Sequence, residues 1–118
     1  MILVGHGSRE KGFSSAMRKV ASAIRRGGRY SDVSCAYLEI ASPSIDDAIG
    51  RAAAKRPSEI RVLPYFVLSG RHVNFHIPAL VRSAKRKYGR LSRIVLCPYL
   101  GYDHRLVELA GKRIAEGK

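Results

Sequence analysis

The chain has 118 residues, of which 46% are apolar, and a formal net charge of +13. This composition excludes an intrinsically disordered chain, and no apolar stretch approaches the roughly 20 residues that a membrane span requires. The positive charge suits a polyanionic partner such as nucleic acid, an anionic membrane or an acidic small molecule, or simply a solvated basic surface. The positions of the charged residues have to distinguish a polyanionic partner from a basic surface that only faces solvent.

The first 40 residues predict a strand, a helix and a second strand. Residues 2–4 are uniformly apolar and indicate a short buried strand. Residues 11–26 carry apolar side chains at spacings of three and four, which is typical of an amphipathic helix. Gly27–Gly28 ends this helix, and residues 33–40 form the second predicted strand.

A second helix and a third strand follow. Ser42 is the predicted N-cap, Pro43 suits the first helical position, and Asp46 and Asp47 add acidic charge to the first turn. Pro57 ends this helix. Residues 60–66 are rich in β-branched and aromatic side chains and predict the third strand.

The remaining residues repeat the alternation. Residues 67–75 are expected to form a loop, and Pro78 to lie in the first turn of a helix that runs to about Lys87. Residues 93–96 predict the fourth strand, and Asp103 caps a helix that runs to about Ala115. The order βαβαβαβα predicts an α/β fold of three layers, a four-stranded parallel sheet flanked by helices, in a single domain over residues 1–118.

Candidate functional residues follow the strands, because ligands of open parallel sheets bind outside the carboxyl ends of the strands. His6 follows the first strand, Glu39 lies near the end of the second, His72 and His76 follow the third, and His104 follows the fourth. All four histidines of the chain are therefore expected on one rim, which favours a functional role.

Each of these side chains also has a structural reading. His6 lies between two glycines, which allow close approach of a ligand, but it could instead bond to a carbonyl of its turn. Glu39 could form a salt bridge at the edge of the core, or act as general base or third metal ligand. His72 and His76 have the spacing of a helical metal pair, although Gly70 and Pro78 argue against a helix there.

Other motifs are missing or incomplete. The Gly5–Ser8 stretch is neither a Walker A loop nor a dinucleotide fingerprint, and no Gly-x-Ser-x-Gly elbow or HExxH motif is present. Cys35 and Cys97 lie far apart in apolar runs, which favours buried free thiols over metal ligands and a reducing cytosol over an oxidising compartment.

Four blocks of the sequence resemble the class II chelatases, the sirohydrochlorin cobalto- and ferrochelatases of the CbiX/SirB type. They occur in the family's order and extend over nearly the whole chain. The blocks are LVGHGSR at residues 3–9, YLEIASPSI at 37–45, LPYFVLSGRHV at 63–73 followed by Ile77–Pro78, and PYLG at 98–101. One departure is His76, where family members often have an acid.

The resemblance implies that His6 and His72 hold the incoming divalent metal and that Glu39 assists proton removal or metal binding. The metal is a substrate, with cobalt favoured over iron and nickel, and no organic cofactor is implied. Longer relatives contain two such domains, and short ones dimerise, so a homodimer is expected. His76 would add a ligand or cap the third helix.

The family substrate, sirohydrochlorin, is a polycarboxylate, which suits a basic rim that includes Arg9, Arg71 and Arg105. The macrocycle could pack on Phe66, Val67, Leu68 and Phe75. The expected substrate-binding residues are Ser8, Arg9, Ser69, Gly70, Arg71 and Phe75.

Two alternatives remain beside the chelatase. One is a non-catalytic metal carrier with the same histidines. The other, less favoured, is a nucleic-acid-binding module, whose nearest candidate is the short basic segment 85–88. The basic residues of the first and third helices are expected to face solvent.

Overall fold

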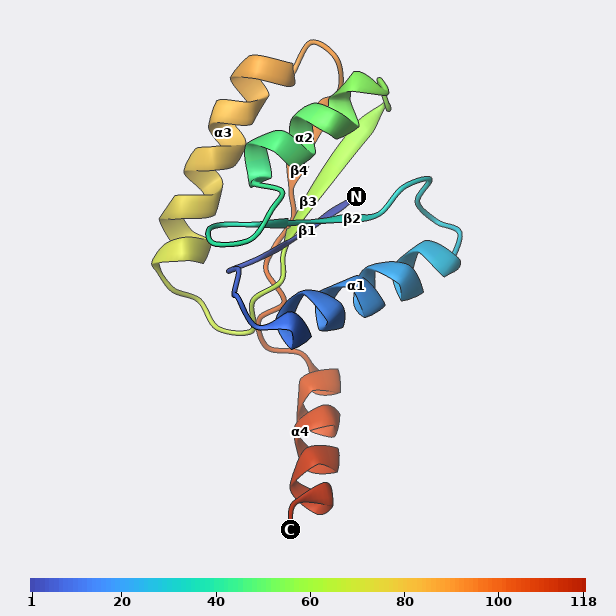
Figure 1. Cartoon of the computed structure of the whole chain (residues 1–118), viewed down its shortest axis with the longest axis vertical. Coiled ribbons are helices and arrows are strands. Elements are labelled where there is room, and N and C mark those ends of the chain that lie inside the picture. Colours follow the sequence, from blue (N-terminus) through green and yellow to red (C-terminus); the bar gives the residue numbers. More distant parts are fainter.

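The computed structural model describes all residues from Met1 to Lys118 and contains one sheet of four parallel strands in the order β2-β1-β3-β4 (Figure 1). This confirms the predicted parallel sheet. Leu3, in the middle of the first strand, pairs with Cys35 on one side and with Leu63 on the other. The strands are β1 (Ile2–Gly5), β2 (Ser34–Tyr37), β3 (Glu59–Pro64) and β4 (Arg93–Leu96).

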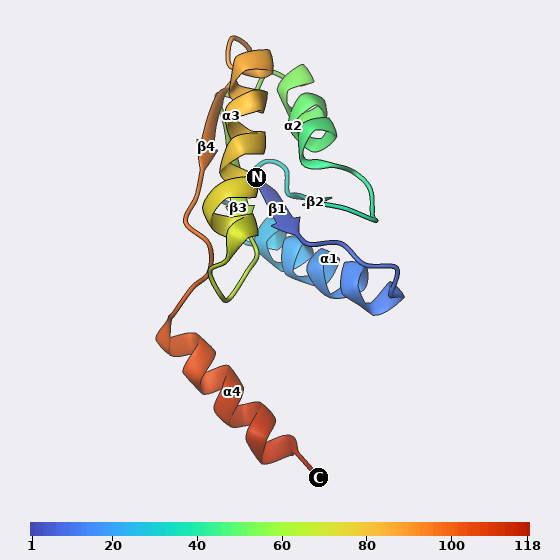
Figure 2. The ribbon, with the colours of Figure 1, turned by 90° about the vertical axis from the view of Figure 1, so that its left-hand side faces the viewer.

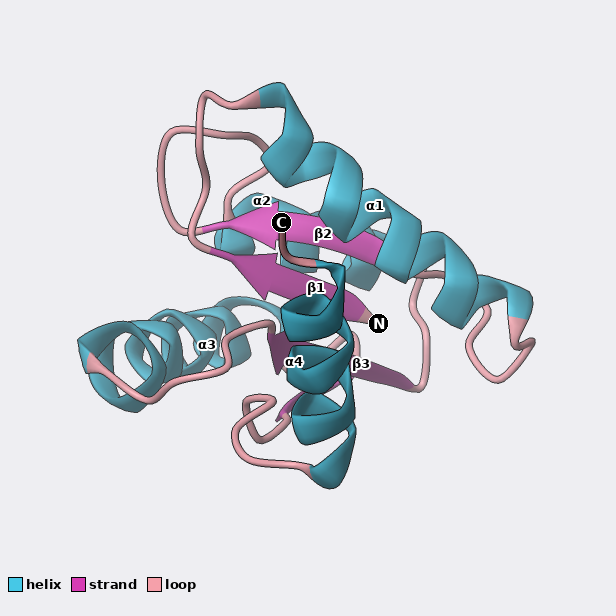
Figure 3. Ribbon diagram, turned by 90° about the horizontal axis from the view of Figure 1, so that it is seen from below, coloured by secondary structure: helices cyan, strands magenta, loops and turns pink.

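Three of the four helices cover the sheet, two on one face and one on the other. Helix α1 packs over β1 and β2, whereas α2 and α3 lie side by side on the opposite face (Figures 1 and 3). The three layers predicted from the alternating pattern are therefore present. The helices are α1 (Lys11–Arg26), α2 (Ile45–Ala54), α3 (Ile77–Tyr88) and α4 (His104–Glu116).

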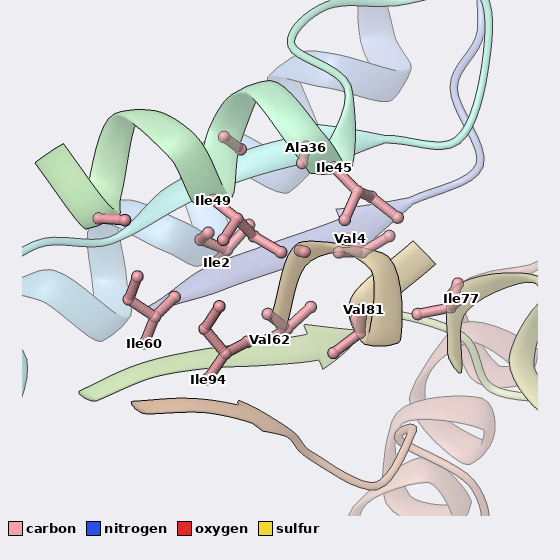
Figure 4. Packing of buried hydrophobic residues seen from close by; sticks show 13 residues of the cluster. Ile2, Val4, Ala36, Ile45, Ile49, Ile60, Val62, Ile77, Val81 and Ile94 are labelled. Carbon is pink, nitrogen blue, oxygen red and sulfur yellow. The ribbon is translucent and has the colours of Figure 1, made fainter. Parts of the chain in front are cut away.

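The larger part of the core lies between the sheet and helices α2 and α3 (Figure 4). Ile2 and Val4 point to this side, and Leu3 points to the other side, where it meets Met17 and Ala21 of α1. Because both faces of β1 are covered, all its residues are apolar or glycine. The other buried members of the larger cluster are Ala36, Ile45, Ala48, Ile49, Ala53, Ile60, Val62, Ile77, Val81, Ala84 and Ile94.

The predicted start of α2 is wrong by two residues. Ser44, not Ser42, is the N-cap, and its Oγ accepts a hydrogen bond from the backbone N–H of Asp47 at 3.2 Å. Pro43 lies before the helix, where its carbonyl oxygen accepts from the N–H of Tyr37. Two serines flank the proline, and the sequence alone does not show which one caps.

Strand β2 is also shorter than the predicted 33–40. Ile40 has a φ of +69°, in the left-handed region, which takes the chain out of the extended conformation. The segment around Glu39 nevertheless continues beside β1, since the N–H groups of Leu38 and Glu39 donate to the carbonyls of Gly5 and His6.

The loop predicted over 67–75 is helical in its last part. His72–His76 form a turn of π-helix, η1, that runs directly into α3. The N–H of Ile77 bonds to the carbonyl of His72, one residue further back than in an α-helix. This wider turn precedes Pro78, whose missing N–H then costs nothing at the start of α3.

Helix α4 begins at the predicted cap, with Asp103 accepting from the N–H of Arg105 at 2.9 Å. Instead of flanking the sheet, the helix extends away from the rest of the molecule, and none of its residues is buried (Figures 1 and 2). No helix of the chain combines the length and apolar character that crossing a membrane demands.

Candidate functional site

The strand order places a topological switch point at the carboxyl ends of β1 and β3. The connection from β1 to β2 uses α1 on one face, and the connection from β3 to β4 uses α3 on the other face. Ligands of open α/β sheets bind at such a switch point between neighbouring strands. His6 comes directly after β1, and His72 belongs to the segment that follows β3.

His6 and Glu39 form the closest pair of polar side chains at this switch point. Nε2 of His6 lies 3.0 Å from Oε1 of Glu39. Gly7 permits the approach, because its φ is +104° and a Cβ at this position would lie 1.8 Å from the carbonyl oxygen of Glu39. Only glycine fits between the turn after β1 and the segment that carries Glu39.

The two ring nitrogens of His6 have different neighbours. Nδ1 lies 3.2 Å from the carbonyl oxygen of Gly7, and Nε2 faces the Glu39 carboxylate. The Gly7 carbonyl oxygen is an acceptor, so this hydrogen bond requires the proton on Nδ1. In the tautomer with its single proton on Nδ1, Nε2 presents a lone pair beside the Glu39 carboxylate, where it can bind a metal ion.

The His72 ring meets His6 edge-on, with the two ring centroids 5.0 Å apart and the ring planes at 67°. On its other side, Nδ1 of His72 lies 3.2 Å from Nδ1 of His76, which is one turn further along η1. One of these nitrogens must donate and the other accept. Three histidines from the ends of two strands thus form one continuous row.

The row is open to solvent. The side chains of His6 and Glu39 are 41% and 56% exposed, and His72 is half-buried. No set of three His, Cys, Asp or Glu side chains converges in a geometry that could hold a metal ion. The imidazoles and the carboxylate instead contact one another in pairs, in positions that an incoming ion can reach.

Among the predicted substrate-binding residues, Arg71 and Phe75 line a shallow cavity with His72 and His76. Arg9 is exposed on the segment after His6, and Ser69 and Gly70 are exposed just before η1. Ser8 is half-buried, and its Oγ accepts from the N–H of Glu10 at 3.0 Å, which gives this hydroxyl a structural partner.

The structure does not gather two of the residues expected on the rim. His104 lies on α4 and pairs with Glu108 at 3.2 Å, so the row contains three of the four histidines. Arg105 is also on α4, beside Asp103. Phe66, expected to face a macrocycle, packs instead against the core cluster under α2 and α3.

Ile40, at the end of the predicted strand 33–40, is 62% exposed directly after Glu39. The only sequence signal for this exposure is its place just before Ala41-Ser42-Pro43, a segment with turn character. Other large apolar side chains are exposed on segments that follow strands, namely Val67, Leu68, Phe75 and Tyr102. Of these side chains, Phe75 lines the shallow cavity with His72 and His76.

Cys35 and Cys97 are free and half-buried, slightly more accessible than expected. Burial raises the pKa of the Cys35 thiol, which keeps it protonated and unreactive. The predicted solvent exposure of the helix charges is confirmed for Arg18, Lys19, Arg25, Arg26, Lys85, Arg86 and Lys87.

The fold and the site define an open α/β protein with imidazole and carboxylate side chains at the switch point of a parallel sheet. The model of the CbiX family matches residues 1–117, and the chain therefore belongs to the CbiX family.

Two relatives illustrate the family's range of chain lengths. The chain is 29% identical to the chloroplastic sirohydrochlorin ferrochelatase of Arabidopsis thaliana over 97% of its own length and 50% of that protein. It is 27% identical to the sirohydrochlorin cobaltochelatase of Methanopyrus kandleri over 98% of its length and 94% of that protein. The chain thus spans about half of the plant relative and nearly all of the archaeal one.

Solved structures agree with the fold. A CbiX protein from Marinobacter aquaeolei VT8 is 27% identical, with a TM-score of 0.79 over 98% of this chain and 92% of that one. The sirohydrochlorin chelatase SirB from Bacillus subtilis subspecies spizizenii, solved in complex with cobalt, has a TM-score of 0.88 at 23% identity, over 98% of this chain and 49% of that one.

Proposed function

We propose that this protein is a sirohydrochlorin chelatase that inserts a divalent metal, with cobalt favoured over iron and nickel, into the tetrapyrrole. The observation that carries the proposal is the contact between the His6 and His72 rings beside Glu39, at the switch point of the sheet. Membership of the CbiX family and relatives named as cobalto- and ferrochelatases support the same activity.

In this proposal His6 and His72 hold the metal before transfer. Imidazole nitrogens are common ligands of divalent transition metals, and two of them leave coordination positions free for the ring nitrogens of the substrate. The solvent-open row suits a metal that must arrive and leave. A closed cage of four ligands would retain the ion instead.

Insertion replaces two pyrrole N–H protons by one divalent ion, so two protons must leave the ring. Glu39 and His6 are placed to receive them, since a carboxylate and an imidazole can each accept a proton. As the metal moves to the ring nitrogens, His6 is released and can take up one of the two protons while Glu39 takes up the other. Nε2 of His6 and Oε1 of Glu39 lie 3.0 Å apart, so both acceptors are at the same place in the site, and both can pass their protons on to solvent.

The substrate would be held by its carboxylates and by its flat apolar ring. Arg9 and Arg71 supply guanidinium groups that can bind carboxylates bidentately, and Ser8, Ser69 and Gly70 add polar groups on the same segments. Phe75 and Leu68 are 69% and 79% exposed and would pack against the macrocycle. The same residues of a second chain in a homodimer would cover the other face of the macrocycle.

We also propose a cytosolic location, which the two free cysteines support. The test of the function is metallation of sirohydrochlorin by the purified protein, followed through the absorbance change of the macrocycle. Many turnovers per protein molecule are expected above the rate without protein. Binding of one metal per chain without turnover would identify a carrier and overturn the chelatase proposal.

A further inference from the structure

A cavity of about 330 Å³ lies between helix α1 and β2, the strand at the edge of the sheet (Figure 3). This volume is at the lower end of the range for small-molecule pockets, which is roughly 300–1,000 Å³. The walls come from α1, from β2 and from the Ser42–Pro43 segment. None of the lining residues belongs to the proposed metal or substrate site, so the cavity is a separate feature of the molecule.

Two arginines of α1 form the basic wall of this cavity. Arg18 and Arg25 are two helical turns apart, so they lie on the same side of α1 and are separated by about 10 Å along its axis. Neither arginine forms an ion pair, and no Asp or Glu lines the cavity. A pocket with two unpaired guanidinium groups and no acidic group attracts an anionic ligand.

The rest of the lining combines apolar surface with hydroxyl groups. Ala21 lies between the two arginines in α1, and Val33 and Cys35 form part of the wall opposite the helix. Burial raises the pKa of the Cys35 thiol and the positive charge of Arg18 lowers it, so the Arg18 guanidinium lies near this wall.

Three serine hydroxyls line the same cavity, those of Ser22, Ser34 and Ser42. None of them forms a hydrogen bond with another group of the protein. Each hydroxyl can donate to a carboxylate oxygen, so all three can add to the binding of an acid that the arginines attract.

We propose that this cavity binds a short-chain dicarboxylic acid. One carboxylate would bond to Arg18 and the other to Arg25, because a guanidinium group can form two parallel hydrogen bonds with a carboxylate. The methylene chain between the two carboxylates would lie on the apolar surface of Ala21 and Val33. A single inorganic anion would leave one arginine and this apolar surface without a partner. The binding does not depend on the proposed metallation activity.

The cavity also contacts both ends of the loop that carries Glu39. Tyr37 precedes this loop, Ser42 and Pro43 follow it, and all three line the cavity. The N–H of Tyr37 donates to the carbonyl oxygen of Pro43 at 2.9 Å, which closes the loop at its base. A ligand that contacts both ends should therefore hold residues 38–41 in place, and with them the Glu39 carboxylate.

Calorimetric titration of the purified protein with glutarate, at constant ionic strength, tests the site. We expect saturable binding to a single class of sites. Arg18→Gln and Arg25→Gln should each raise the Kd by about tenfold or more, since each removes one charge-assisted pair. Arg26→Gln is the matched control, because it removes the same charge from the same helix outside this cavity, and it should bind glutarate like the parent. Equal weakening in all three variants, or no binding by the parent, would overturn the site.

Two further ligands test the chemical class. Butyrate keeps the apolar chain and one carboxylate, whereas inorganic phosphate keeps a negative charge without the chain. Both should bind about tenfold more weakly than glutarate, because each leaves one of the two arginines without a charge-assisted hydrogen bond. Phosphate or butyrate binding as tight as that of glutarate would overturn the assignment of a dicarboxylic acid.

Hydrogen exchange of the parent protein tests the contact with the Glu39 loop. The N–H groups of Leu38 and Glu39 donate to the carbonyls of Gly5 and His6. Bound glutarate should slow the exchange of both amides, since a loop held at both ends opens less often. Saturation with glutarate without this protection would overturn the link between the cavity and the loop.

Discussion

His6 and Glu39 face each other where the chain leaves β1 and β2, with Nε2 of the imidazole 3.0 Å from Oε1 of the carboxylate. Neither residue is in the core, and the contact exists because Gly7 lets the two backbone segments approach. A pair that contributes little to packing and is open to solvent can exchange protons and metal, which makes it the natural starting point for testing the proposed chemistry.

Replacement of either proposed metal ligand should remove most of the activity. His6→Ala and His72→Ala are each expected to lower the metallation rate by on the order of 100-fold or more, since each removes a ligand and a proton acceptor. Thermal unfolding should change little, because both side chains lie outside the core clusters. His104→Ala is the control and should keep the parent rate. A variant of His6 or His72 with parent turnover would remove that residue from the metal site.

Glu39→Gln should have a smaller and pH-dependent effect. The amide keeps an oxygen near Nε2 of His6 but can no longer accept a proton, and solvent can take over part of that role. We expect about a tenfold loss of rate, at the low end of what a general base contributes. The measurement is the metallation rate between pH 6 and pH 9, roughly the range in which an imidazole and its partners titrate. A profile parallel to that of the parent would show that Glu39 only positions His6.

His76 is expected to position His72 through the contact between their Nδ1 atoms, which are 3.2 Å apart. His76→Ala should raise the KM for the metal ion by roughly tenfold, in the range measured for residues that orient a metal ligand. His76→Glu restores an acceptor for the Nδ1–H of His72 and should recover much of the loss. Metal titrations that monitor the KM for the ion separate this role from direct catalysis. If the parent, His76→Ala and His76→Glu all had equal rates, His76 would not position His72, and its role would be limited to forming the π-helical turn.

The sequence predicts the fold well because apolar periodicity reports burial. It also predicts that His6 and His72 meet, since residues that follow strands β1 and β3 lie at a switch point. The sequence does not predict the η1 turn, because Gly70 and Pro78 disfavour an α-helix, whereas a π-turn bonds Ile77 to His72 and accommodates the proline. It does not predict the position of α4 either, because an apolar stripe indicates that a helix packs but not which surface it packs on.

Gly7→Ala should destabilise the protein and distort the site together. Its Cβ would lie 1.8 Å from the carbonyl oxygen of Glu39 at a φ of +104°. The cost in the free energy of unfolding should be about 1–3 kcal/mol, measured by urea denaturation. Gly12→Ala in α1 is the control, since a Cβ there meets no atom within 4 Å. It should leave stability unchanged or raise it by roughly 0.5 kcal/mol. Equal stability of the two variants would mean that the turn after β1 can move freely.

The last prediction concerns the choice of metal. Imidazole ligands do not select sharply among divalent iron, cobalt and nickel, and affinity rises in that order for a given site. Two histidines with open positions therefore leave the choice to metal supply, and the purified protein should metallate sirohydrochlorin with more than one of the three ions. Parallel assays under anaerobic conditions, at equal free metal, measure the three rates. The His72→Ala variant should lose activity with every ion if all use the same ligands. If the parent protein metallated sirohydrochlorin with only one of the three ions, a further ligand that selects this ion would be required. If folded protein metallated sirohydrochlorin with none of the three ions, the chelatase proposal itself would be refuted.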